Sequence, residues 1–319
     1  MKVRFVEEHR DEHGVEPIID ALQGTCAEIA PSTYYAARTR RPSTRAVGDE
    51  LTLAKIRQVH ATNYGVYGAR KTWRCLARAD YRVARCTVER VMRANGIRGI
   101  SKAKSPRTTI PAPAGNRPDD LVQRAFDADG PNQLWVADIT YIRTFSGWVY
   151  AAFVMDMYSR RIVGWQVSTS LHATLALDAL EMGLWNRDRT GQPRGSGSET
   201  PDLIHHSDRG VQYRAVRYTE RLEDAEIVAS VGSKGDSYDN AAAEAFNSTF
   251  KSELIRNRHV LADKGPWRSI DDLEIAVAEW IEWYNTTRLH GSLNDVPPNE
   301  YEITYYADHA PSRPVGATP

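Results

Sequence analysis

The sequence predicts an α/β protein in which an all-helical N-terminal part precedes a mixed five-stranded sheet flanked by helices. One observation is a change of hydrophobic periodicity, from helix-like spacing before residue 101 to strand-like runs after residue 126. A second is the division of charge. Residues 1–118 hold 22 Lys and Arg against 11 Asp and Glu, whereas residues 119–319 hold 19 against 30. A basic helical part joined to an acidic part indicates that the first part binds a polyanion.

The composition is that of a globular protein with two or three domains: 319 residues, 41% hydrophobic and 26% charged. No apolar run approaches the roughly 18 residues that span a bilayer, and the N-terminus lacks a signal-peptide core. We therefore expect no membrane partner and a cytoplasmic location. Cys26, Cys75 and Cys86 are widely spaced, which favours neither a disulfide framework nor a thiolate zinc site.

The N-terminal part is expected to contain a small helical module at residues 1–48 and a helix-turn-helix domain at residues 49–101. In the second segment, three short helical patterns with a tight turn between the last two give the helix-turn-helix outline. Many bundles that do not bind DNA share this outline, but residues 51–118 hold 15 basic and only 2 acidic side chains. The candidate DNA contacts are the basic residues of the second and third helices: Arg70, Lys71, Arg74, Arg85, Arg90 and Arg93.

A basic, Pro-rich linker is expected at residues 102–125, and a catalytic core with a C-terminal helix at residues 126–303. Residues 304–319 are expected to form a tail. In the core, three β-rich runs read as an antiparallel meander, and they are followed by helix, strand, helix, strand and helix. This is the order of the ribonuclease-H-like fold, in which the first and fourth strands are neighbours.

Three carboxylates lie on or beside predicted strands and helices that this fold would bring close together. Asp138 interrupts the apolar run 134–142, Asp208 ends the run 203–208, and Glu244 follows Asp208 after thirty-five intervening residues in an alanine-rich helix. A carboxylate in a buried strand is costly unless a cation compensates it. If the three converge, they form an oxygen-rich site for two Mg²⁺ ions, or Mn²⁺, and phosphodiester cleavage or transfer is the corresponding reaction class.

Other acidic residues compete for these roles. Asp156 follows the second strand but is close to a turn, and Asp236 and Asp239 lie in a glycine-containing loop. Asp239 or Asn240 is better suited to cap the next helix. We therefore exclude the three aspartates and keep Asn240 only as a group supporting the carboxylates.

Two basic or neutral side chains extend the predicted site. Lys251 lies two helical turns after Glu244 on the same face and could contact a phosphate, although a solvated lysine fits the pattern equally well. His206 shares its strand face with Asp208, so we expect it to support the carboxylates. No Cys or His cluster accompanies it, which argues against zinc.

Several motifs together resemble one known family. They are Asn63-Tyr-Gly-Val-Tyr-Gly-Ala-Arg-Lys71, Val83-Ala-Arg-Cys-Thr-Val-Glu-Arg-Val-Met92, Leu134-Trp-Val-Ala-Asp-Ile-Thr-Tyr141, Tyr158-Ser-Arg-Arg-Ile-Val-Gly-Trp165, His205-His-Ser-Asp-Arg-Gly-Val-Gln-Tyr213, Asp239-Asn-Ala-Ala-Ala-Glu244 and Tyr284-Asn-Thr-Thr-Arg-Leu-His290. With them, nearly the whole chain resembles the transposases of bacterial insertion sequences with two overlapping reading frames. The match is to the second-frame product, OrfB, which has a retroviral-integrase-like core.

The resemblance implies a mechanism and its residues. The family's catalytic carboxylates fall on Asp138, Asp208 and Glu244, and its downstream basic residue falls on Lys251. It implies Mg²⁺-dependent cleavage at element ends, followed by attack of the freed 3′-hydroxyl on a target phosphodiester, without a covalent protein–DNA intermediate.

The resemblance also implies partners: double-stranded DNA as element ends and target, further copies of the chain in a synaptic complex, and the first-frame product OrfA or a fusion to it. The chain begins at Met1 without the family's heptad run, so we expect it to need that first part for autonomous transposition. Two other functions remain open from the residues, a catalytically idle DNA-binding regulator and a ribonuclease of the same fold.

Overall fold

The computed structural model describes residues 2–101, 128–191, 203–208, 210–231 and 241–309. The chain divides into two compact units, Met1–Lys55 and Ile56–Pro319. The predicted linker at residues 102–125 lies outside the described residues.

The first unit contains helices α1 (Lys2–His13), α2 (Val15–Ala21) and α3 (Pro31–Thr39), as expected for a small helical module. Its core is a small apolar cluster that includes Val6, Ile19 and Tyr34. The next helix, α4, runs from Thr44 to Thr62. The predicted boundary between residues 48 and 49 therefore falls inside a continuous helix.

The helix-turn-helix pattern is present in the structure, formed by α4, α5 (Ala69–Arg78) and α6 (Arg85–Ala94). Ile56, Leu76 and Val88 are fully or almost fully buried. The turn between α5 and α6 is held by the indole of Trp73, which donates a 2.9 Å hydrogen bond to the carbonyl oxygen of Val83. Each of the three helices thus buries at least one apolar side chain.

A five-stranded mixed sheet forms the second part of the larger unit, in the order β3-β2-β1-β4-β5. The strands β1, β2 and β3 are antiparallel neighbours, and β4 and β5 run parallel to β1. This confirms the predicted meander and the predicted adjacency of the first and fourth strands. The elements are β1 (Leu134–Thr144), β2 (Gly147–Asp156), β3 (Ile162–Ser168), α7 (Ala173–Arg189), β4 (Ile204–Ser207), α8 (Val216–Asp224) and β5 (Val228–Val231).

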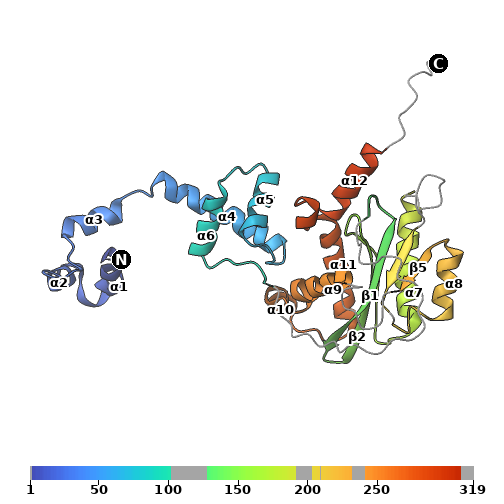
Figure 1. Cartoon of the computed structure of the whole chain (residues 1–319). Coiled ribbons are helices and arrows are strands. Elements are labelled where there is room, and N and C mark those ends of the chain that lie inside the picture. The colour runs from blue at the N-terminus through green and yellow to red at the C-terminus, as the bar shows by residue number, and fades with distance from the viewer. Residues whose placement is uncertain (1, 102–127, 192–202, 209, 232–240, 310–319) are drawn as a thin grey trace, which may run out of the picture. The chain divides into compact units, whose positions relative to one another are not determined.

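Helices cover both faces of this sheet (Figure 1). Along β1, Val136 and Ile142 belong to the apolar cluster shared with α9 (Ala241–Phe250) and α11 (Ile270–Thr286). Trp135 and Ala137 belong to the cluster shared with α7 and α8. Successive side chains of a strand point to opposite faces, so every even-numbered position near the centre of β1 faces α9.

The C-terminal part is more helical than the sequence predicted. A π-helical turn, η1 (Lys251–Ile255), continues α9. It is followed by α10 (Arg258–Lys264), α11, the 3-10 turn η2 (Gly291–Leu293) and α12 (Pro298–Asp308). The tail expected from residue 304 thus begins inside α12. All helices in the described part of the chain are too short or too polar to cross a membrane.

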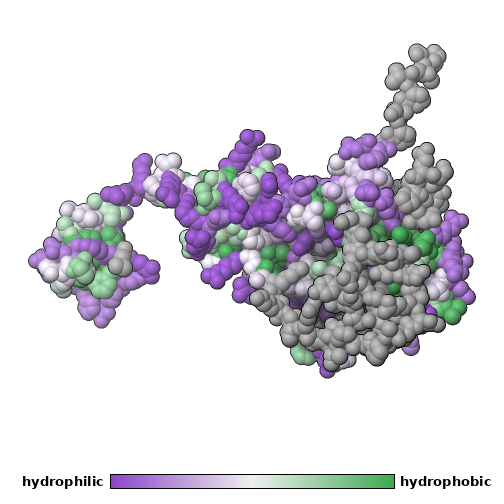
Figure 2. Space-filling view, in the orientation of Figure 1, coloured by the Kyte–Doolittle hydropathy of each residue, from purple (hydrophilic) through white to green (hydrophobic). Residues whose placement is uncertain are grey.

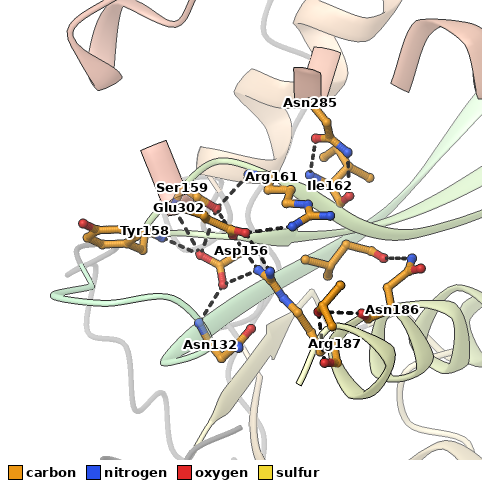
Figure 3. A network of polar contacts seen from close by, with 12 residues as sticks. Asn132, Asp156, Tyr158, Ser159, Arg161, Ile162, Asn186, Arg187, Asn285 and Glu302 are labelled. Atoms are coloured by element: carbon orange, nitrogen blue, oxygen red, sulfur yellow. Dashed lines mark hydrogen bonds and ion pairs between the residues drawn. The ribbon is translucent and has the colours of Figure 1, made fainter. Parts of the chain in front are cut away.

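Asp156, which we excluded from the predicted site, belongs to a network of polar contacts (Figure 3). Its Oδ2 accepts hydrogen bonds from Nη2 of Arg187 at 3.1 Å and from the backbone N–H of Asn132 at 2.7 Å. The same Arg187 donates to Glu302 of α12 at 2.8 and 2.6 Å. All three side chains are buried. The network therefore connects α7 and α12 to the end of β2, and the Asp156 carboxylate is taken up by its hydrogen bonds to Arg187 and Asn132.

Candidate active site

Asp138 and Asp208 are placed next to each other by the register of two parallel strands. The last pair between β1 and β4 is Ala137 with Ser207, and the two aspartates are the residues that follow. Parallel strands advance together, so positions 138 and 208 lie at the same level along the sheet. The adjacency of the first and fourth strands that the element order predicts thus places the two positions side by side.

Asp138 is half-buried on the face that α9 covers. Its Oδ2 accepts a 2.7 Å hydrogen bond from Nδ2 of Asn247, and its Oδ1 accepts a 2.9 Å bond from the N–H of Ile139. Burial, and then the negative charges of Asp208 and Glu244, raise the pKa of Asp138 to about 7. Three carboxylates from β1, the end of β4 and α9 are therefore electrostatic neighbours.

Asp208 is exposed and follows the last residue of β4, Ser207. Its Oδ1 accepts a 2.9 Å hydrogen bond from the N–H of Gly210. A Cβ atom at residue 210 would lie 2.9 Å from the same oxygen, which is closer than ordinary packing permits. The glycine lets the backbone approach and orient the Asp208 carboxylate, whose charge acts on Asp138.

Glu244 lies exposed in the first turn of α9. The preceding residue predicted to support it, Asn240, lies outside the described residues. Asn247, three residues after Glu244, was missed by the sequence reasoning although i, i+3 spacing places it on the same helix face. The signal was available, but an asparagine in a helix has too many ordinary roles to be singled out.

The donor set fits a hard divalent cation in its chemistry. Besides the carboxylates, Oδ1 of Asn247 is buried and has no hydrogen-bond partner among the described residues. Carboxylate and amide oxygens are the ligands that Mg²⁺ prefers. No three acidic, His or Cys side chains in the described residues are arranged as a complete metal-binding group. Mutual repulsion between like charges opposes such an arrangement when no cation balances it.

Lys251 begins the π-helical turn that follows α9 and is half-buried. Burial and the neighbouring Arg256 lower its pKa, while the charge of Asp138 acts in the opposite direction. Together with Arg143 and Arg256, Lys251 lines a pocket of about 630 Å³ that has no acidic residue in its lining. The lysine thus lies between the carboxylates and a cationic surface.

His206 is buried on the α9 face, since it pairs with Val136, but its Nδ1 lies 3.0 Å from Oγ of Ser230 on β5. Its neighbour His205 faces the other side and contacts the hydroxyl of Tyr218 at 3.0 Å. Burial lowers the pKa of His205 to about 4. His206 therefore shares a sheet face with Asp138. Its side-chain contact, however, is with Ser230 of β5.

Tyr213 is a second residue that the sequence reasoning missed. It is buried, and burial together with the charges of Tyr218, Asp138 and Asp208 raises its pKa well above the ordinary value. Its hydroxyl has no hydrogen-bond partner among the described residues. No sequence signal indicates this contact, because Tyr213 follows β4 at a position with no regular strand or helix spacing to Asp208.

The predicted DNA contacts on α5 have partners within the protein. Arg70 and Arg74 both form ion pairs with the buried Asp295, at 3.0 and 3.3 Å. The Lys71 ammonium lies 5.4 Å from the centroid of the Tyr67 ring, and burial lowers its pKa to about 8. This face of α5 is directed at the C-terminal part of the unit.

The candidates on α6 are more open. Arg85 is exposed and forms a 2.7 Å ion pair with Glu89 one turn later, Arg90 is half-buried, and Arg93 is exposed in the last turn. Figure 2 shows the visible face of the helix-turn-helix segment covered mainly by hydrophilic residues. Exposed arginines thus lie on both α5 and α6, but Arg70 and Arg74 of α5 are paired with Asp295 of the C-terminal part.

Family models match both parts of the chain. A model described as an HTH-like domain matches residues 47–105, and two models described as integrase core domain match residues 128–237 and 225–298. Among solved structures, the catalytic core domain of HTLV-2 integrase in complex with magnesium aligns with a TM-score of 0.42 and 14% identity, over 55% of this chain and 99% of that chain.

Curated relatives match over most of their length. The putative transposase for insertion sequence element IS986/IS6110 of Mycobacterium tuberculosis is 50% identical over 88% of this chain and 96% of its own length. The transposase for IS629 of Shigella sonnei is 43% identical over 95% and 96%. The transposase InsF for IS3A of Escherichia coli is 32% identical over 95% and 98%. The chain belongs to the insertion-sequence transposases with an integrase core, as a second-frame (OrfB) product of the IS3 family.

Proposed function

We propose that this protein is a DNA transposase that cleaves the ends of its insertion sequence and joins the freed 3′-hydroxyl to target DNA by transesterification. The observation that best supports the proposal is geometric: Asp138 lies level with Asp208 across the β1–β4 pairing and accepts a hydrogen bond from Asn247 on the helix that carries Glu244. The match to integrase core and HTH-like models over both parts of the chain supports the same conclusion.

In this proposal, oxygen atoms of Asp138, Asp208 and Glu244 hold two Mg²⁺ ions, for which Mn²⁺ can substitute. Such ions would activate the attacking oxygen and stabilise the leaving oxygen of the phosphodiester. The chain's own contribution is to hold the carboxylates in place. Asn247 orients Asp138 by its hydrogen bond, and the Gly210 N–H orients Asp208.

Lys251 is proposed to bind a DNA phosphate beside the carboxylates. Its position in the lining of a pocket whose described lining residues include no acidic side chain supports this role. Cationic side chains attract the DNA backbone without reading its sequence. His206 is proposed to support the sheet below the carboxylates, since it shares the α9 face with Asp138.

Recognition of the element ends is proposed for the helix-turn-helix domain, residues 49–101, with double-stranded DNA as the partner. Arg85, Arg90 and Arg93 on α6 are the proposed contacts, because the last helix of this motif usually enters the major groove. Arg70, Lys71 and Arg74 are proposed to contribute at the edge of this surface, where Asp295 competes for the two arginines.

Joining two element ends requires two active centres in one assembly, so we further propose that the chain works as a homo-oligomer. The first-frame product OrfA, separate or fused, is the proposed additional partner. Because the proposed substrate is bacterial DNA, the proposed place of action is the cytoplasm.

The deciding experiment compares the wild type with Asp208→Asn on labelled element ends and a plasmid target in the presence of Mg²⁺. The substitution keeps the side-chain volume and removes one negative charge from the proposed metal site. We expect strand transfer to be lost while binding of the ends, measured by gel shift, stays close to wild type. Undiminished strand transfer by Asp208→Asn would reject the proposed site.

A wild type that shifts the labelled ends but never nicks them would instead identify a DNA-binding regulator. Cleavage of an RNA–DNA hybrid without preference for element ends would identify a ribonuclease. The matched control is Asp224→Asn, which changes an exposed aspartate at the end of α8 and should leave both assays unchanged.

A further inference from the structure

Two motifs far apart in the sequence meet in the structure, although neither has a role in the proposed chemistry. One is the loop 63–68 between α4 and α5, and the other is the segment 283–290, which includes the end of α11. The hydroxyl oxygen of Tyr67 accepts a 2.8 Å hydrogen bond from the N–H of Leu289. The indole N–H of Trp283 donates a 3.1 Å bond to Oδ1 of Asn63.

The loop is packed tightly at this contact. Tyr67 is completely buried. Gly65 has a φ of +68°, and a Cβ atom there would lie 2.5 Å from the ring of His259. The carbonyl oxygen of Tyr64 accepts a 2.8 Å hydrogen bond from Nδ2 of Asn257. Gly65 therefore permits close docking of this loop onto α10.

Arg288 lies at the centre of the contact and is buried together with Glu253. Its Nε and Nη2 donate to the two carboxylate oxygens of Glu253 at 2.7 and 2.6 Å, which is a bidentate pair. The guanidinium lies 5.4 Å from the centroid of the Tyr284 ring, and its Nη1 lies 3.4 Å from the ring of His290. A planar guanidinium held from several sides has one orientation, which a lysine could not reproduce.

The Arg288–Glu253 pair bears on the active site because of where Glu253 lies. It belongs to the π-helical turn η1, which continues α9 without a break. The helix α9 carries Glu244 and Asn247, so fixing Glu253 fixes the end of the helix that presents them. π-helical turns inside helices occur frequently at functional sites.

We propose that Arg288 is a positioning residue: through Glu253 it sets the placement of α9 in the active site, and through the neighbouring Tyr67–Leu289 bond it couples α9 to the helix-turn-helix loop. The inference rests on the proposed function, since it assigns Glu244 and Asn247 a place in the transposase reaction. This buried contact then links two events: DNA binding by the helix-turn-helix and alignment of the carboxylates for reaction.

The test uses the full chain with Arg288→Lys and Tyr67→Phe. Arg288→Lys keeps the positive charge and loses the bidentate geometry, whereas Tyr67→Phe removes only the oxygen that accepts from Leu289. We expect both to lower kcat for strand transfer, Arg288→Lys by roughly tenfold or more because small misplacements at a reacting centre are costly. We expect KM for element ends to change less than about twofold, and the Mg²⁺ concentration for half-maximal activity to rise.

A purely structural role would give a different pattern. It would lower the melting temperature while leaving kcat per folded molecule and the Mg²⁺ requirement unchanged, and that result overturns the inference. If Arg288→Lys fails to fold, Tyr67→Phe decides, because it alters no buried charge. The matched control is Arg221→Lys, which changes a more exposed arginine paired with Glu181 and should leave kcat and the Mg²⁺ requirement as in wild type.

Asp208→Asn in the same assay separates the two proposals. If Asp208→Asn is active, the proposed function fails whatever Arg288 does. If Asp208→Asn is inactive while Arg288→Lys and Tyr67→Phe match the wild type in kcat and Mg²⁺ requirement, only the positioning role is overturned.

Discussion

Nδ2 of Asn247 on α9 donates a 2.7 Å hydrogen bond to Oδ2 of Asp138 on β1. The bond joins residues 109 positions apart in the sequence and connects the helix of Glu244 to the strand of the first carboxylate. It orients the Asp138 carboxylate and leaves the amide oxygen of Asn247 buried beside it.

Asn247→Ala is therefore expected to reduce Mg²⁺-dependent strand transfer by roughly 10- to 100-fold, the usual loss when a group orienting a metal ligand is removed. Single-turnover rates on pre-cleaved ends would measure it. Ser248→Ala changes the exposed neighbour on the same helix and should have no effect. Equal rates for both variants would mean that the hydrogen bond does not serve the reaction.

Mg²⁺ is expected to stabilise the folded protein through the same carboxylates. A ligand that binds only the folded state adds about 2.7 kcal/mol at a concentration one hundred times its Kd. The melting temperature of the wild type should rise with added Mg²⁺, whereas Asp138→Asn should show little or no rise. A rise of full size in Asp138→Asn would remove that residue from the metal site, and Asp224→Asn serves as the control.

Lys71 should make stability depend on pH, because burial lowers its pKa to about 8 in the folded chain. An unfolded lysine has a pKa near 10.4. Between these values the unfolded chain binds more protons, so this residue makes the free energy of unfolding rise with pH. Lys71→Met lacks this contribution, and we expect its stability relative to wild type to fall from pH 8 to pH 10.

Denaturant unfolding at pH 7, 8, 9 and 10 would measure this difference, with the exposed Lys55→Met as the control. A Lys71→Met difference that is independent of pH would show that the ammonium is as solvated in the folded chain as in the unfolded one. The Lys71 ammonium would then be available to contact DNA.

Salt dependence distinguishes the basic residues of α6 from those of α5. Each neutralised phosphate contributes about −0.9 to the slope of log affinity against log salt. Arg93→Ala should reduce the steepness of this slope by about one phosphate, whereas Arg70→Ala should change it less because Asp295 already pairs with Arg70. Equal changes in the two slopes would contradict the assignment of α6 as the main DNA-contacting helix.

The network around Asp156 should matter for stability and not for metal binding. Arg187→Met leaves Asp156 and Glu302 buried without their shared cation, which is expected to cost about 3–5 kcal/mol. Arg221→Met breaks a more exposed pair and should cost about 0–1 kcal/mol. Denaturant unfolding measures both, and a similar small cost for Arg187→Met would show that the buried network does not hold α12 in place.

Much of the fold could be predicted because its signals are local. Apolar periodicity located the strands and most helices, and the element order implied that β1 and β4 are neighbours, which the Ala137–Ser207 pairing confirms. Turn η1 and helix α12 escaped prediction. Neither has an apolar periodicity of its own, and Glu302 is buried together with partners from distant elements, among them Arg187 of α7 and Ser159.

The sequence by itself determined the order of elements and singled out Asp138, Asp208 and Glu244 as candidates, because strand and helix patterns follow from the spacing of side chains. Only the tertiary structure decided that Asn247 orients Asp138, that Lys71 packs on Tyr67 inside the protein, and that Arg288 grips Glu253. Such contacts join residues distant in sequence, and their energies depend on burial and on partners that no local pattern encodes.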